Sequence, residues 1–347
     1  MISDDSLREG MQAPGISFST AEKVDLAKKI SECGISKILI SYPPAHKSEA
    51  IVASEVTRKG YFKEVFGLGR AIKQDIDLIY STGANISLHF PFKYDSIEEI
   101  YSNVKYAVSL GKKVEIAIVD ITQYSTGQLM KIVSRLSELG VDTIQLPDTM
   151  GKATPKIMER VVRESKKISN SSIEIHCHND LGLSVANAIA GMEAGADSVD
   201  TTFLGLGERN GITDTGVMAR YLETTGRHTN LNLGRIDNLS IEFLGIVLKK
   251  AGESFFGKNL PNIGRNTYIH TAGTHAAFSD VFEGQDFSVN VYTGKSMLKK
   301  ILEAKHVNLS KENLSTLMER VKDLSASEGR VIGADEIARE AEELCTE

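Results

Sequence analysis

The sequence predicts an α/β protein, a (β/α)8 TIM barrel followed by two small C-terminal subdomains. Three observations lead to this prediction. Eight short apolar runs occur in the first two-thirds of the chain, a segment of helical period follows each run, and the rhythm changes beyond about residue 230. Strands that are apolar throughout are typical of a parallel sheet covered by helices, and eight repeats close a barrel. An open doubly wound sheet is the alternative, but no Gly-X-Gly-X-X-Gly motif follows the first run.

The runs and the segments between them define the expected elements. Two helices carry clear start signals, because Ser19 precedes Glu22 by three residues and Thr154 directly precedes Pro155. The expected strands are residues 1–4, 37–41, 65–69, 86–90, 114–119, 143–146, 173–176 and 198–201. The expected helices lie near residues 19–32, 47–58, 71–81, 96–110, 123–138, 154–168, 182–193 and 213–225.

The change of rhythm after the last repeat predicts the domain boundaries. We expect a catalytic barrel over residues 1–255, an irregular linker subdomain over 256–296 and a small helical subdomain over 297–347. The middle stretch is rich in turn residues, and an apolar helical period returns after Ser296. No low-complexity linker separates the parts, so we expect them to dock on the barrel.

Composition limits the function classes. The net charge of −6 and the lack of a dense basic run argue against nucleic-acid and membrane-surface partners. No apolar stretch is long enough to span a bilayer, and the chain opens on a strand instead of a leader. The cysteines, Cys33, Cys177 and Cys345, are scattered and odd in number, so we expect reduced thiols and a cytoplasmic protein.

Polar residues gather where predicted strands end. Five of the eight loops at that mouth of the barrel carry them: the loops with Arg8 and Glu9, with His89, with Asp148 and Thr149, with His176 and His178, and the glycine-rich 205–211. Chemistry in such barrels lies at the carboxyl ends of the strands. We therefore expect one active site at this mouth.

The His-X-His pattern at residues 176–178 predicts a metal site. Residues two apart on a strand face the same side, so both imidazoles can converge on one ion. Glu9 supplies a third, anionic ligand and Arg8 a cation beside it; three ligands leave open positions, as in catalytic sites. The alternatives are a histidine that caps a helix or bonds in the core, and a surface ion pair between Arg8 and Glu9.

Four motifs together resemble a known superfamily. They are residues 7–15 (LREGMQAPG), 146–151 (LPDTMG), 176–182 (HCHNDLG) and 205–213 (GLGERNGIT). The chain is similar to the metal-dependent TIM-barrel condensing enzymes and lyases, which include homocitrate synthase, 2-isopropylmalate synthase, citramalate synthase, hydroxymethylglutaryl-CoA lyase and 4-hydroxy-2-oxovalerate aldolase. The tail, with 270–275 (HTAGTH) and 292–298 (YTGKSML), looks like the extra subdomains of the synthases.

The resemblance implies a reaction and roles for residues. It implies an acyltransferase that condenses acetyl-CoA, or a close acyl-CoA, with a 2-oxo acid to give a 2-hydroxy acid and free CoA. One divalent ion (Zn, Mn, Mg or Fe) would stabilise the developing alkoxide together with Arg8. A base would deprotonate the acyl methyl group, with His275 as first choice and a water as the alternative. Family synthases supply that histidine across a dimer interface, so a homodimer is expected.

The remaining roles follow residue by residue from the same resemblance. Its metal ligands match Glu9, His176 and His178. Its substrate-binding residues match Gln12, His89 and Thr149, although His89 fits a buried core histidine nearly as well. His270 is a weaker candidate than His275 for catalysis. The loop that shapes the acyl-CoA mouth matches Gly205, Gly207, Arg209 and Asn210.

Some positions depart from the family pattern. Leu39 stands where most relatives carry a glutamate that buttresses the active-site arginine, so Asp4 or Asp5 must take over or Arg8 is less rigid. Ala117 replaces an arginine that grips a distal carboxylate, and Val119 replaces a serine. Met11 also stands in place of an acidic residue, and Ile212 in place of an asparagine ligand. Arg70 and Lys93 are the candidate partners for a second anionic group of the substrate.

Two other functions remain open at this stage. A lyase or aldolase on the same barrel is the second enzyme class, although such lyases usually carry a cysteine in a glycine-rich loop that this chain lacks. The lost residues at Leu39 and Ala117 also fit a barrel that binds metal and metabolite without turnover.

Overall fold

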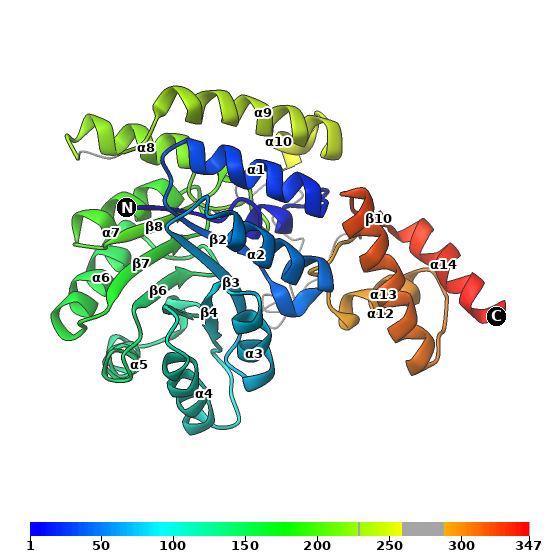
Figure 1. The fold of residues 1–347 in the computed structure, drawn as a ribbon, viewed down its shortest axis with the longest axis horizontal. Helices are drawn as coiled ribbons and strands as arrows, with labels where there is room; N and C mark the ends of the chain where they lie inside the picture. Colours follow the sequence, from blue (N-terminus) through cyan, green and yellow to red (C-terminus); the bar gives the residue numbers. More distant parts are fainter. Residues whose placement is uncertain (228–229, 259–287, 347) are drawn as a thin grey trace.

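Eight parallel strands close into a barrel in the computed structural model, which describes residues 1–227, 230–258 and 288–346 (Figure 1). Each strand pairs with the next along the chain, and β1 pairs with β8 to close the sheet. The predicted TIM barrel is confirmed. The strands are β1 Ile2–Asp4, β2 Lys37–Ser41, β3 Glu64–Arg70, β4 Asn85–Phe90, β5 Val114–Ile118, β6 Thr143–Asp148, β7 Ser172–Cys177 and β8 Ser198–Thr201.

A helix follows each strand and covers the outside of the barrel (Figure 1). Their starts follow local signals: the side chain of Ser19 accepts a hydrogen bond from the Glu22 N–H, and Pro155 occupies the first turn of α6. The barrel helices are α1 Thr20–Glu32, α2 Lys47–Lys59, α3 Lys73–Ser81, α4 Ile97–Ser109, α5 Thr126–Glu138, α6 Pro155–Ile168, α7 Ser184–Glu193 and α8 Thr215–Thr224. Short 3-10 turns follow four strands: η1 Glu9–Gln12, η2 Pro43–Ala45, η3 Ile121–Gln123 and η4 Phe203–Gly205.

Three strands extend further at their carboxyl ends than their apolar runs, and the first is β3, which ends at Arg70 instead of residue 69. β6 ends at Asp148 instead of residue 146, and β7 ends at Cys177 instead of residue 176. Parallel pairing continues beyond the apolar residues, with Pro147 opposite His176. Because the sheet itself holds these polar ends, the side chains that they carry toward the mouth of the barrel are rigidly placed.

The interior of the barrel contains a polar layer, whereas the space between sheet and helices is apolar. Such interiors are usually filled by branched apolar side chains. Here Lys37 Nζ donates to Glu174 at 2.7 Å and also contacts Glu115, and Gln145 Nε2 donates to Glu174 at 3.1 Å. All four side chains are buried. Pairing of opposite charges offsets part of the cost of taking them out of water.

The C-terminal helices form a lobe beside the barrel, next to α1 and α2 (Figure 1). Their own apolar core includes Leu298, Leu317 and Val321. Of the expected irregular subdomain, residues 259–287 lie outside the described residues, so the three-part division stays a prediction. The elements after the barrel are α9 Leu233–Ala251, α10 Phe255–Lys258, β9 Ser288–Val289, α12 Lys295–Ala304, α13 Lys311–Glu328, β10 Ile332–Gly333 and α14 Ala334–Thr346.

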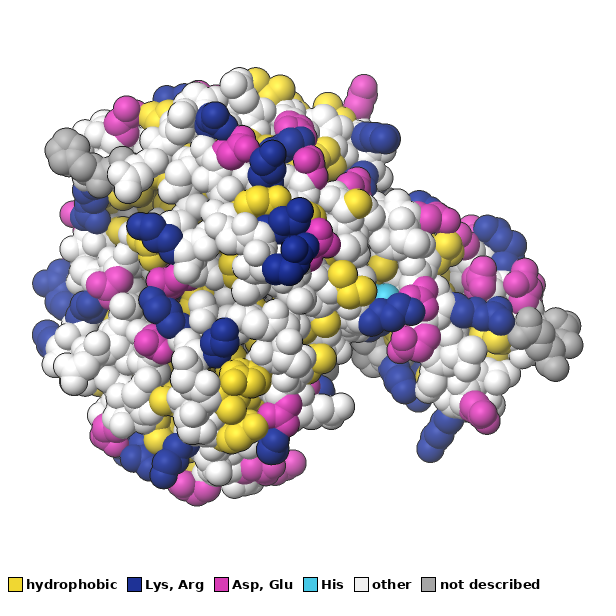
Figure 2. Space-filling model, in the orientation of Figure 1, with side chains coloured by type: hydrophobic (Ala, Val, Ile, Leu, Met, Phe, Trp, Pro, Cys, Tyr) yellow, Lys and Arg dark blue, Asp and Glu magenta, His cyan; other side chains and the backbone are white. Residues whose placement is uncertain are grey.

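Basic and acidic side chains are interspersed over the face shown in Figure 2. Among the residues that the structure describes, no helix has both the length and the apolar character needed to cross a bilayer.

Candidate metal centre and active site

Three predicted metal ligands meet at the mouth of the barrel. One ligand atom from each of Glu9, His176 and His178 lies within 4.8 Å of the other two, and all three side chains are buried. Glu9 comes from η1, His176 from β7 and His178 from the residue after that strand. Cys177, between the histidines, points into the apolar core. Two imidazole nitrogens and one carboxylate form a donor set that suits a divalent transition metal.

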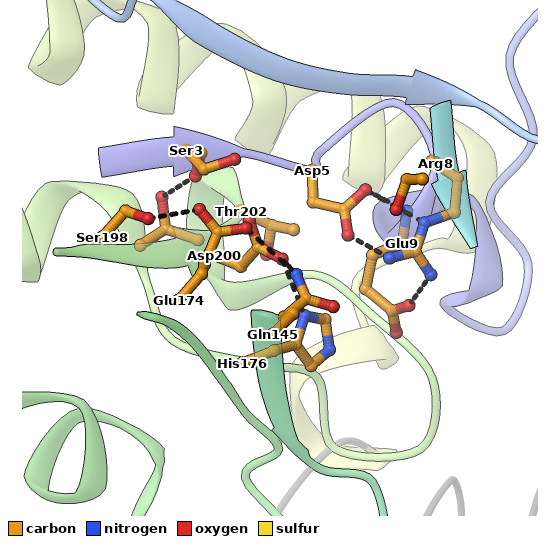
Figure 3. Close-up of polar contacts among 12 residues, drawn as sticks. Ser3, Asp5, Arg8, Glu9, Gln145, Glu174, His176, Ser198, Asp200 and Thr202 are labelled. Carbon is orange, nitrogen blue, oxygen red and sulfur yellow. Dashed lines mark hydrogen bonds and ion pairs between the residues drawn. The ribbon is translucent and has the colours of Figure 1, made fainter. Parts of the chain in front are cut away.

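Arg8 lies beside this cluster and is held by Asp5 (Figure 3). Its Nε donates to Asp5 Oδ1 at 3.0 Å, Nη2 contacts the other carboxylate oxygen, and Nη1 donates to Glu9 Oε2 at 2.6 Å. Burial disfavours the charged guanidinium, but the carboxylates of Asp5 and Glu9 outweigh burial and raise the pKa of Arg8. Arg8 and Glu9 therefore form an ion pair, but this pair is buried and is not the surface ion pair considered from the sequence.

Asp5 supplies the buttress that Leu39 lacks. Leu39 is buried inside the barrel against Phe66 and Leu68 and offers no polar atom to Arg8. The forked contact of Asp5 takes the place of the expected glutamate. Asp5 is one of the two carboxylates, with Asp4, that the sequence analysis named as replacements for this glutamate. Asp4 instead accepts hydrogen bonds from the backbone and side chain of Ser6.

The glycine-rich loop after β8 packs directly on Glu9. The backbone N–H of Glu208 donates to Glu9 Oε1 at 2.9 Å. A Cβ at Gly207 would lie 2.9 Å from the same oxygen, so a larger residue at this position would displace the Glu9 carboxylate. Gly211 has a φ of +80°, and a Cβ there would meet the carbonyl of Gly205. The glycines thus close the loop onto a predicted metal ligand, and their own contact with acyl-CoA stays a prediction.

Arg209 is turned inward. It is 2% exposed, its Nε donates to Asp180 Oδ1 at 2.7 Å, and its Nη2 donates to the carbonyl of Thr149 at 2.7 Å. The guanidinium therefore ties the loops after β6, β7 and β8 together. Asn210 beside it is also buried. Both side chains are thus buried instead of facing solvent at the mouth. The predicted role of Arg209 and Asn210 in binding acyl-CoA stays a prediction.

The cluster opens into a cavity of about 40 Å³ at the mouth of the barrel. The predicted substrate-binding residues Gln12, His89 and Thr149 line it, together with Arg8 and the three predicted metal ligands. Burial, followed by the charge of Arg8, lowers the pKa of His89 to about 3, so its imidazole is neutral at physiological pH. Thr149 Oγ1 accepts the Asp120 N–H at 2.9 Å, and its own proton remains to be donated. The full lining is Arg8, Glu9, Gln12, His89, Ala117, Val119, Gln145, Pro147, Thr149, His176 and His178.

A larger cavity of about 450 Å³ adjoins the first. His89 and Val119 line both, so they stand where the two spaces meet. Ile72 and Ile100 contribute apolar lining, and Arg70 and Lys93, the predicted anion partners, also lie there. The fork of Arg70 is already bound by Asp75, through contacts of 2.8 and 2.9 Å. The sequence did not indicate this cavity, because its lining comes from three separate loops and from α4.

Asp200 contacts the ring of His176, and the sequence pattern does not indicate this contact. Asp200 Oδ2 lies 3.2 Å from His176 Nδ1 and also contacts Gln145, so it bridges the polar layer to the metal cluster (Figure 3). A carboxylate on one ring nitrogen orients the other toward a metal. The available signal was a charged residue inside a strand expected to be apolar throughout. His270 and His275 lie outside the described residues.

Comparison with known proteins identifies the family of this chain. A family model described as HMGL-like matches residues 1–241. The chain belongs to this family. It is 30% identical to the 2-isopropylmalate synthase of Sulfurisphaera tokodaii, over 98% of this chain and 94% of that protein. It is 28% identical to the homocitrate synthase AksA of Methanosarcina mazei, over 97% and 89%.

Solved structures share the fold of this HMGL-like chain. A hydroxymethylglutaryl-CoA lyase from Acinetobacter baumannii, in complex with coenzyme A and 3-methylmalate, has a TM-score of 0.62 and 22% identity, over 78% of this chain and 96% of that one. The lyase from Brucella melitensis has a TM-score of 0.60 and 21% identity, over 70% and 97%. The sequence resemblance is thus confirmed at the level of a condensing-enzyme family related to isopropylmalate and homocitrate synthases.

Proposed function

We propose that this protein condenses an acyl-CoA, acetyl-CoA in the first instance, with a 2-oxo acid. The products are a 2-hydroxy acid with a second carboxylate and free CoA. One observation carries the proposal: Glu9, His176 and His178 converge within 4.8 Å beside Arg8, which Asp5 fixes in place. This arrangement suits stabilisation of negative charge on a keto oxygen during carbon–carbon bond formation.

The donor set fits a catalytic divalent ion. Three protein ligands leave coordination positions for a substrate, and the cavity lies on that side. When bound, such an ion supplies Lewis acidity toward a keto oxygen. The ions that the sequence proposed, Zn, Mn, Mg or Fe, all accept nitrogen and carboxylate ligands to some degree.

The residues around the cavity have separate tasks in this reaction. The guanidinium of Arg8, always charged, faces the developing alkoxide. The neutral His89 donates or accepts one hydrogen bond without adding charge. Gln12 and Thr149 hold the carboxylate end of the 2-oxo acid, through an amide and a hydroxyl that line the same cavity. We propose His275 as the base that takes a proton from the acyl methyl group. The resulting enolate then attacks the keto carbon of the 2-oxo acid. Water finally cleaves the thioester and releases CoA.

The adjoining cavity suits the side chain of the 2-oxo acid. A small 2-oxo acid such as pyruvate would need only the inner cavity, whereas a longer side chain would pass between His89 and Val119 into the outer one. Val119 gives that passage an apolar side, and Ala117 adds apolar lining to the inner cavity. We therefore propose a 2-oxo acid with an extended, largely apolar side chain. Lys93 is the residue that would select a distal anion instead.

The test is release of CoA thiol from acetyl-CoA with a panel of 2-oxo acids. The panel runs from pyruvate through 2-oxoisovalerate and longer straight chains to 2-oxoglutarate, with Mn²⁺, Zn²⁺ or Mg²⁺ added. We expect release with at least one acid, and loss of release in His178→Ala. No release with any acid and metal refutes the condensing reaction. Metal-dependent cleavage of 3-hydroxy-3-methylglutaryl-CoA or of 4-hydroxy-2-oxovalerate without condensation would favour a lyase, although neither Cys33 nor Cys177 reaches the cavity.

Metal-dependent binding of a 2-oxo acid without any product would instead favour a non-catalytic barrel. Binding is compared between the wild-type protein and His176→Ala by calorimetry. The proposal expects binding and turnover to be lost together in that variant.

A further inference from the structure

A short C-terminal segment, residues 290–293, is buried against the barrel near the metal centre. It lies between β9 and α12, and Val291 and Tyr292 belong to the barrel core instead of the core of the C-terminal lobe. The exposed fractions of Asn290, Val291 and Thr293 do not exceed 3%. A segment that carries polar side chains into a core must bond them there.

Asn290 bonds to the turn that carries a metal ligand. Its Nδ2 donates to the carbonyl of Met11 at 2.7 Å, and Met11 lies in η1 between Glu9 and Gln12. The rest of Asn290 is fixed within the segment, because Oδ1 accepts the Tyr292 N–H at 2.9 Å and its N–H donates to Thr293 at 3.1 Å. The amide is therefore pre-oriented toward η1.

Tyr292 bonds to a buried ion pair on the other side of the segment. Its hydroxyl donates to Glu49 Oε2 at 2.7 Å, and Lys23 Nζ donates to Glu49 Oε1, also at 2.7 Å. Burial, followed by the charge of Glu49, raises the pKa of Tyr292, so the phenol stays protonated and remains a donor. Glu49 Oε2 also accepts the Tyr42 N–H at 3.2 Å, directly after β2.

We propose that Asn290 and Tyr292 are positioning residues for the metal centre. Through Met11, Asn290 fixes the η1 turn that carries Glu9 and Gln12, and Tyr292 anchors the segment that presents Asn290. A 3-10 turn has weaker internal hydrogen bonds than an α-helix, so an external bond to its carbonyl decides its orientation. The C-terminal lobe would thus complete the active site of its own chain without touching the substrate. The inference rests on the metal site of the proposed function.

The test measures metal affinity, which is independent of turnover. Mn²⁺ is titrated into the full-length metal-free protein, and free Mn²⁺ is followed by electron paramagnetic resonance. We expect Asn290→Ala to raise the Kd for Mn²⁺ about ten- to hundredfold, the range for groups that support metal ligands. Tyr292→Phe, which removes one hydroxyl, should raise it by a smaller factor. Each variant's Tm is measured in the same buffer.

Ser325→Ala is the matched control. It removes another buried hydroxyl where lobe and barrel meet, 3.1 Å from Ser17, away from η1. We expect the Kd of this variant to stay within twofold of wild type. If Asn290→Ala and Tyr292→Phe also stay within twofold while Tm falls as in the control, the segment only docks the lobe and the proposal is overturned.

The positioning role and the condensing reaction can be refuted independently of each other. Weaker Mn²⁺ binding in Asn290→Ala supports the positioning role even if wild type releases no CoA. If wild type is active, Asn290→Ala should also lower kcat or raise KM for the 2-oxo acid, and Ser325→Ala should change neither.

Discussion

Replacement of Asp5 by asparagine tests how Arg8 is held. Asp5→Asn keeps the shape of the side chain and an oxygen that accepts from Arg8 Nε, now at 3.0 Å. The amide nitrogen, however, would face Nη2, a donor that contacts a carboxylate oxygen in the native protein. One charge-assisted hydrogen bond is lost, and Arg8 is left to pair with Glu9, the proposed metal ligand.

The size of the effect follows from that single bond. A hydrogen bond to a charged group contributes about 1.5–3 kcal/mol. If this energy fixes the guanidinium where charge develops, its loss lowers kcat/KM about ten- to hundredfold, since about 1.4 kcal/mol corresponds to tenfold. We also expect the Kd for the metal to rise, because Arg8 draws the Glu9 carboxylate away from the site.

Asp75→Asn provides the matched control. Asp75 binds Arg70 with the same forked geometry, with contacts of 2.8 and 2.9 Å, at the end of β3. Asp75 is buried like Asp5, but the arginine that it holds lines the outer cavity instead of the metal cluster, so the kcat of Asp75→Asn should stay within about threefold of wild type. The assay is CoA release under saturating metal, with Tm measured for each variant. A kcat/KM for Asp5→Asn within twofold of wild type would refute the idea that Asp5 aims Arg8.

Three further predictions address other parts of the site. His178→Ala should bind no stoichiometric Mn²⁺ or Zn²⁺ after dialysis, measured by elemental analysis, since only two ligands remain; a retained equivalent of metal would contradict the assigned ligand set. Val119→Phe should close the passage between the cavities and raise KM for long-chain 2-oxo acids at least tenfold while that for pyruvate stays within about threefold; an equal rise for both acids argues against the passage. Burial raises the pKa of Asp4 to about 7, so the proton on Asp4 stabilises the fold fully below about pH 4 and this contribution is lost as the pH rises toward 7. Asp4→Asn should therefore gain stability relative to wild type between pH 5 and 8, by about 3 kcal/mol in urea unfolding, and a difference independent of pH would show that Asp4 is ionised throughout.

The repeat pattern of the chain was enough to predict the barrel. Apolar strands and amphipathic helices have different periods, so the two repeats stay distinct in the sequence. The strand Lys37–Ser41 was predicted with its observed limits. The error at β6 and β7 has one cause: backbone pairing does not require apolar side chains, so a strand continues into polar residues when its neighbour does.

The site was only partly predictable. His176 and His178 were visible from their spacing on one strand, and Glu9 because the carboxyl ends of barrel strands meet at one mouth. Asp200 and the cavity behind Val119 were not, since the contact of Asp200 with His176 and the shape of the cavity depend on how side chains of neighbouring strands and loops pack. The bond from Asn290 to Met11 joins residues 279 positions apart, and no local pattern indicates it.

The polar layer inside the barrel has a consequence for engineering. Its members, Lys37, Glu115, Gln145, Glu174 and Asp200, come from five different strands. A chimera that exchanged half of this barrel for that of a relative would separate the lysine from its carboxylates and leave uncompensated charge at the centre of the molecule. Recombination between relatives should therefore succeed only where both parents carry matching interior charges, or where all five positions are transferred as a set.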